Sequence, residues 1–230
     1  MGTGVFLPYF LIPIGWAFNS MGRTTVTSSS AEAFSLPLPL YTAHKIATLK
    51  NQAGEMFDIF IGADTAIVEK VREKSLDVGD TELQQNTSDK KRFGEGLYEE
   101  WYSKDRTPFA LVHAASGALA AFVWFGQKPL GRKSLKYLSE EELKKELQQR
   151  DEEWHTLVYR AYPPYRGKGL MGDFVRFAIA EYRKHYPEVK LWVGGRADNA
   201  ASFGLAERLG FKNREDLFDA EKNWKAMTIE

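Results

Sequence analysis

The sequence predicts a single α/β (α+β) domain with a mixed, mostly antiparallel sheet flanked by helices. Its length of 230 residues suits one domain, and the apolar share of 43% suits a globular protein with a real core. Two stretches have the pattern of β-hairpins, and strands alternate with helices after residue 153. We expect the domain to span residues 43–230, preceded by a lead-in of uncertain role at 1–42.

The lead-in opens with an apolar run that Pro8 and Pro13 interrupt and that is too short for a membrane span. It lacks the basic start of a signal peptide, although the Ala-Glu-Ala at 31–33 resembles a cleavage site. A true start at Met21, or packing of this segment on the fold, is favoured over secretion. Residues 22–42 are rich in Ser, Thr and Pro and are expected to be loose.

The sequence pattern of the first half of the domain predicts two hairpins and two helices. The stretch HKIATLKNQAGEMFDIFIG predicts two strands joined at NQAG, and Asp64 then caps a helix. Ser88 is expected to cap a second helix, whose apolar stripe is Phe93, Leu97 and Trp101. The stretch FALVHAASGALAAFVWFG predicts a hairpin that turns at Ser116–Gly117.

The second half begins with a charged helix at 139–150, which starts with a capping box of Ser139 and Glu142. A strand, WHTLVYRAY, follows, and then a glycine loop and a helix from Leu170 to His185. The strand VKLWVG, the helix NAASFGLAERLG and a terminal hairpin complete the expected order.

Composition excludes several classes of function. Lys plus Arg and Asp plus Glu are 31 each, so no net charge attracts a nucleic acid. There are no cysteines, which excludes thiolate metal sites and a cysteine-acyl intermediate. The four histidines show no metal-ligand spacing, so no metal is expected.

The loop YRGKGLMG, residues 165–172, has the composition of a phosphate site. Gly167 and Gly169 allow positive φ and a close approach of the backbone, and the helix that follows favours an anion at its start. With Gly172 the loop also satisfies the dinucleotide fingerprint. That interpretation fails in context, because too few strand–helix units follow. A P-loop is absent.

Two motifs resemble those of the GNAT-type N-acetyltransferases. Arg166, Gly167, Lys168, Gly169 and Leu170 match the family's motif A, [Q/R]-x-x-G-x-[G/A], with Met171 in place of its small last residue. The stretch NAASFGLAERLGF is similar to N-x-x-[A/S]-x-x-L-Y-x-x-x-G-F. It matches at Asn199, Ser202, Leu205, Gly210 and Phe211. The resemblance is specific over about residues 153–211.

The resemblance implies a GNAT-like fold and acetyl-CoA as cosubstrate. Backbone N–H groups of Arg166, Gly167, Lys168, Gly169, Leu170 and Met171 would hold its pyrophosphate. Groups around Ala161 and Pro163 would pair with the pantetheine arm, and Asn199 would reach that arm from the second motif. Asn199 is equally well placed to cap its helix.

The same resemblance suggests the catalytic groups. His155 stands where many relatives have a glutamate base, and an imidazole is a suitable base near neutral pH. A structural histidine is an equal alternative. Ala206 replaces the tyrosine that often protonates the CoA thiolate, so Tyr159, Tyr162 or water would take over that step.

We therefore expect a cytoplasmic enzyme that transfers an acetyl group from acetyl-CoA directly to an amine on a small molecule or a protein. No nucleic acid or membrane partner is expected, and a homodimer is left open. The alternatives are a non-catalytic acyl-CoA-binding or regulatory module, a transferase for another acyl donor, and a dinucleotide enzyme.

Overall fold

The structure is a computed structural model, and it describes residues 24–28, 34–131, 141 and 154–230. Its strands and helices follow one another along the chain with the bounds below. The strands are β1 Thr25–Ser28, β2 Ala43–Lys50, β3 Met56–Gly62, β4 Thr107–His113, β5 Leu119–Gln127, β6 Trp154–Ala161, β7 Lys190–Arg196, β8 Lys212–Asp219 and β9 Trp224–Ile229. The helices are α1 Thr65–Leu76, α2 Thr81–Asn86, the π-helical turn η1 Lys90–Gly94, α3 Tyr98–Tyr102, α5 Leu170–His185 and α6 Ala200–Arg208.

All described strands belong to one sheet, in the order β1-β2-β3-β4-β5-β6-β7-β9-β8. Every neighbouring pair is antiparallel except β6 and β7, which are parallel. These two strands pair only over Trp154–Thr156 and Lys190–Trp192, and they separate beyond that point. The predicted fold class, a mixed and mostly antiparallel sheet flanked by helices, is confirmed.

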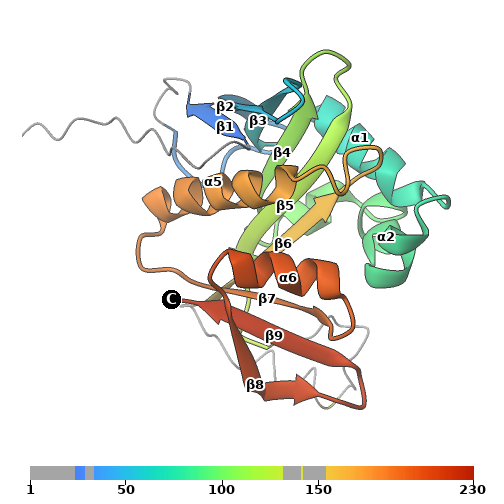
Figure 1. Cartoon of the computed structure of the whole chain (residues 1–230), viewed down its shortest axis with the longest axis vertical. Helices are drawn as coiled ribbons and strands as arrows, with labels where there is room; N and C mark the ends of the chain where they lie inside the picture. Colours follow the sequence, from blue (N-terminus) through green and yellow to red (C-terminus); the bar gives the residue numbers. More distant parts are fainter. Residues whose placement is uncertain (1–23, 29–33, 132–140, 142–153) are drawn as a thin grey trace, which may run out of the picture.

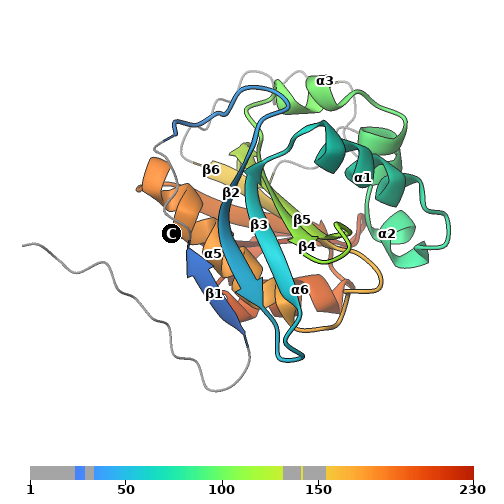
Figure 2. The same ribbon diagram turned by 90° about the horizontal axis from the view of Figure 1, so that it is seen from above.

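The sheet separates two groups of helices (Figures 1 and 2). Helices α5 and α6 cover one face, where Phe174, Ala178 and Ala206 join the larger hydrophobic cluster. Helices α1 and α3 cover the other face, where Val71 and Trp101 join a second cluster. A strand that lies between them therefore presents alternate side chains to two different environments.

Local sequence signals explain several elements. The Asp64 carboxylate accepts the N–H of Ile67 at 2.8 Å and so caps α1 as predicted. The β4–β5 hairpin turns at Gly117, whose φ is +67°. The predicted helix Leu170–His185 is α5, and α6, β7 and the terminal hairpin also form as expected.

The single helix predicted from Ser88 is wrong. The segment contains η1 and the separate short helix α3, and Leu97 is 60% exposed instead of buried. The reason is Gly96, where a Cβ would lie 2.7 Å from the carbonyl oxygen of Lys91. The chain folds too tightly there for a regular helix to continue through it.

The described part of the lead-in belongs to the fold. Strand β1 pairs with β2, and Leu38 is buried in the larger core cluster. Residues 25–28 and 34–42 are therefore not the loose segment that their composition suggests. The predicted charged helix at 139–150 lies outside the described residues, apart from the helical residue 141. In the described ranges, no helix combines the length and apolar character needed to span a membrane.

Candidate functional site

The glycine loop follows the C-terminal end of β6, beyond the part of this strand that has separated from β7 (Figure 1). Gly167 and Gly169 have φ of +79° and +75°, values that side chains rarely tolerate. A Cβ built on either glycine, or on Gly172, would meet nothing within 4 Å. The backbone of the loop therefore borders open space, as close approach of a ligand requires.

The loop and the first turn of α5 present unpaired backbone donors. The N–H of Arg166 donates to Tyr162 at 3.1 Å, and that of Lys168 donates to Tyr165 at 3.4 Å. Within the described part of the chain, no backbone acceptor takes the N–H groups of Gly167, Gly169, Leu170 or Met171. Four donors without a backbone acceptor thus lie at or just before the N-terminus of a 16-residue helix, the positive end of its dipole. This geometry fits a pyrophosphate, although Arg166 and Lys168 do not supply the N–H groups that the motif suggested.

The Arg166 side chain fixes the loop to α2 instead of pointing to a ligand. Its Nη2 and Nη1 donate to the Asp80 carboxylate at 2.6 and 2.9 Å, and its Nε donates to the Ala161 carbonyl at 3.1 Å. Burial would raise the pKa of Asp80, but the hydrogen bonds from Arg166 and the Leu83 N–H, with the charges of Arg166 and Lys74, together outweigh this and hold the pKa below its usual range. The Lys168 ammonium lies 5.4 Å from the ring centre of Tyr165.

The other proposed cofactor contacts lie at the end of β6, just after it, and at the start of α6. The Pro163 carbonyl accepts a hydrogen bond from Lys74 Nζ at 3.2 Å. From Leu157 to Ala161, β6 has no register with β7, so this edge of the strand is open to a pantetheine arm. Asn199 caps α6 by accepting the N–H of Ser202 at 3.1 Å, and it also borders a shallow pocket. Its capping role is confirmed.

His155 lies at the start of β6 and faces the C-terminal end of α5. Its Nδ1 is 2.5 Å from the hydroxyl of Tyr182, and its ring packs against Tyr186. Burial, with a smaller effect of nearby Arg106, lowers the pKa of His155, which favours the neutral ring. The structure does not bring His155 to the glycine loop, which lies at the opposite end of α5.

Tyr159 joins β6 to α6. Its hydroxyl donates to the backbone carbonyl of Ser202 at 2.7 Å, and burial raises the pKa of Tyr159, so the phenol is protonated. Ala206, the residue at the family's tyrosine position, is fully buried. Tyr162 is fully buried as well.

A cavity of about 490 Å³ opens on the other face of the sheet, where β6 and β7 part. Thr156, Val158 and Arg160 of β6 line it, and these alternate along the strand with His155, Leu157 and Tyr159. Its walls also contain Arg92 and Trp124. Sequence reasoning missed this cavity, although strand alternation already places Arg160 on the face opposite His155.

Comparisons with known proteins agree with this geometry. The model of the acetyltransferase (GNAT) family matches residues 77–211. No curated protein sequence matches the chain. Several solved structures are similar, but their sequence identities are so low that the likeness supports the fold alone.

One similar structure is the GNAT domain of S. lividans PAT, with 9% identity, a TM-score of 0.53, and coverage of 84% of this chain and 98% of that one. A GNAT-family acetyltransferase from Bacillus anthracis has 11% identity, a TM-score of 0.50, and coverage of 74% and 93%. An uncharacterised protein from Bacillus halodurans has 10% identity, a TM-score of 0.54, and coverage of 83% and 91%. Because the family model covers more than half of the sequence and the fold agrees, the chain belongs to the GNAT family of acetyltransferases.

Proposed function

We propose that this acyltransferase moves an acetyl group from acetyl-CoA to a primary amine. One observation supports the donor above all others: the unpaired N–H groups of Gly167, Gly169, Leu170 and Met171 at the mouth of α5. They form an anion site beside the open edge of β6, where a diphosphate and an extended amide-bearing arm would be held together. We place the enzyme in the cytoplasm, with its donor.

Acetyl-CoA supplies an acetyl group activated as a thioester. In the transfer, the amine nitrogen forms the C–N bond, the C–S bond breaks, and its electron pair stays on sulfur. The sulfur then takes one proton, and the amine loses one. The chain must therefore hold the donor in place, supply a proton near the sulfur and admit the amine in its neutral form.

Tyr159 is our candidate for the proton donor. In an α-helix the carbonyl of one residue points toward the N–H of the residue four positions later, so the Ser202 carbonyl points toward Ala206. The Tyr159 hydroxyl is bound to that carbonyl at 2.7 Å. A phenol from β6 thus lies close to the position from which the family's tyrosine would extend, and its raised pKa keeps the proton in place.

The donor site is tested with Gly169→Glu, which places a carboxylate and extra bulk at the proposed diphosphate. We expect CoA binding, measured by titration calorimetry, to weaken at least about 100-fold, since charge repulsion adds to the loss of the cradle. Gly54→Glu is the matched control. Gly54 also has a positive φ, of +83°, and a Cβ there would meet only the flexible end of Lys50, at 4.0 Å, but it lies in the β2–β3 turn.

Equal CoA affinity in the two variants would overturn the loop assignment. The transferase proposal would be overturned if the wild-type protein binds CoA but forms no free CoA from acetyl-CoA with any amine of a broad panel. In that case the acyl-CoA-binding module would be the better description.

A further inference from the structure

The cavity behind the β6–β7 separation has a strongly basic wall. Seven of the described residues that line it are Lys or Arg, and none of them is Asp or Glu. Three of the seven carry the argument, namely Arg92, Lys104 and Arg160. The whole chain has no net charge, so this concentration of cations is a property of the cavity.

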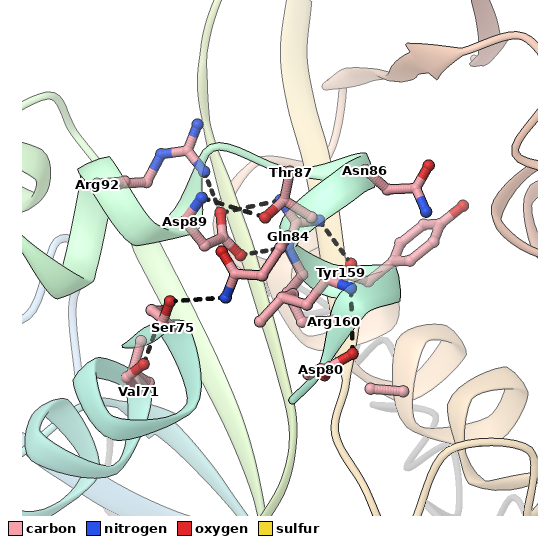
Figure 3. Close-up of polar contacts among 12 residues, drawn as sticks. Val71, Ser75, Asp80, Gln84, Asn86, Thr87, Asp89, Arg92, Tyr159 and Arg160 are labelled. Carbon is pink, nitrogen blue, oxygen red and sulfur yellow. Dashed lines mark hydrogen bonds and ion pairs between the residues drawn. The ribbon is translucent and has the colours of Figure 1, made fainter. Parts of the chain in front are cut away.

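Arg92 and Arg160 share one buried carboxylate (Figure 3). Asp89 accepts from Arg92 Nη1 at 2.5 Å, from Arg160 Nε at 2.5 Å and from Arg160 Nη2 at 3.1 Å. Its side chain is 0% exposed, whereas those of Arg160 and Arg92 are 15% and 28% exposed. Two cations on one anion leave a net charge of +1, and both cations reach the cavity wall.

Arg92 has donors to spare. A guanidinium carries five N–H donors, and one Arg92 group, Nη1, is bound to Asp89 within the described residues. The guanidinium lies 5.5 Å from the ring centre of Trp124, and that of Arg160 lies 5.0 Å from the same ring. Both arginines are thus held by an ion pair and an indole ring. Arg160 already donates from Nε and Nη2 to Asp89 and from Nη1 to the Tyr159 carbonyl. Arg92 is therefore the guanidinium best able to bind an oxyanion in a planar, bidentate way.

Aromatic side chains complete the cavity. Trp101, Trp124, Trp192 and Trp224 all line it, and Trp101 and Trp124 pack edge to face at 5.7 Å. Indole walls favour an apolar or planar body, and the cationic wall favours an anionic group on the same molecule. The positive potential also opposes a second ammonium charge, so it lowers the pKa of a bound amine and favours its neutral, nucleophilic form.

We infer that the acceptor is an amine that also carries an anionic group, a carboxylate or a phosphate, which Arg92 binds with help from Lys104 and Arg160. This inference rests on the proposed function and adds the substrate class to it. Polyamines and other purely cationic amines are poor acceptors for such a cavity. The described wall contains no Asp, Glu or His, so the amine's proton leaves to water.

The test uses amines in matched pairs that differ only in the anionic group. Phenylalanine is compared with phenethylamine, glucosamine 6-phosphate with glucosamine, and spermidine is the cationic reference. We expect kcat/KM to be at least about tenfold higher for the anionic member of one pair, since a bidentate charge-assisted contact has at least that effect. The pair that responds distinguishes carboxylate from phosphate.

Arg92→Gln should raise KM for the anionic amine about tenfold or more and leave KM for acetyl-CoA unchanged. Lys91→Gln removes the same charge one residue away, from an exposed side chain outside the cavity wall, and should change neither value. Lys104→Gln is the second variant. Its exposed side chain can be changed without touching the Asp89 cluster.

Several results would overturn the inference. They are equal or better use of the neutral and cationic amines, a rise in the KM for acetyl-CoA in Arg92→Gln, and equal effects of Arg92→Gln and Lys91→Gln. If CoA does not bind, the proposed function fails separately. The preference for anionic amines is then measured as the rise in Tm that each amine causes. If the anionic and neutral amines raise Tm equally, the inference about the acceptor is overturned.

Discussion

The buried charge cluster around Asp89 gives a quantitative prediction for stability. In Asp89→Asn, the carboxylate that holds Arg92 and Arg160 is replaced by a neutral amide. The Asp89 side chain is 0% exposed and accepts three charge-assisted hydrogen bonds from the two arginines. Removing one partner from a buried ion pair costs about 3–5 kcal/mol, since the remaining charges stay desolvated without compensation. Here two guanidinium groups would also repel each other.

Urea unfolding, followed by tryptophan fluorescence and extrapolated to water, measures this loss. Asp216→Asn is the control, because Asp216 pairs with Arg214 at 2.7 Å near the surface, where the Asp216 side chain is 59% exposed and that of Arg214 is 31% exposed. We expect that variant to unfold like the wild type. A loss of less than about 1 kcal/mol in Asp89→Asn would refute the view that this cluster is a tightly coupled buried pair.

The cluster also predicts a pH dependence. Burial alone would raise the pKa of Asp89, but Arg160 and Arg92 hold it below the ordinary value of 3.8. The unfolded chain therefore binds the proton more readily, so the stabilisation is present above that value and is lost as pH falls through the folded pKa. Asp89→Asn should remove this part of the acid sensitivity, and an unchanged acid limb of the Tm profile would contradict the assignment.

Two further variants test the groups on the other face of β6. His155→Gln should flatten the fall of Tm below pH 6.5, because the lowered pKa of His155 makes its stabilisation present above 6.5 and lost as pH falls through the folded pKa. The pH profile of turnover should keep its shape, and the loss of a limb would instead establish His155 as the base. Tyr159→Phe should lower kcat about tenfold or more and leave KM for acetyl-CoA unchanged. Tyr102→Phe, which removes a hydroxyl bound to the Leu38 carbonyl at 2.6 Å, is the control, and equal kcat values in the two would exclude Tyr159 as the proton donor.

The sequence by itself determined the elements whose causes are local. The cap at Asp64, the hairpin turn at Gly117 and the full extent of α5 follow from residue types within a few positions of one another. The glycine loop is of the same kind, because positive φ at Gly167 and Gly169 depends on those residues themselves. The family resemblance followed from such local motifs, and the family-model match confirms it.

Only the tertiary structure decided which charges meet. Arg160 pairs with Asp89 across 71 residues, and Arg166 pairs with Asp80 across 86. No spacing in the sequence marks such partners, since their proximity depends on how α2 and η1 pack against β6. The same packing pairs Arg166 with α2 instead of leaving it free at the proposed diphosphate site, and it gathers Arg92 and Arg160 at the cavity. The basic wall of that cavity exists only because distant segments of the chain fold against one sheet.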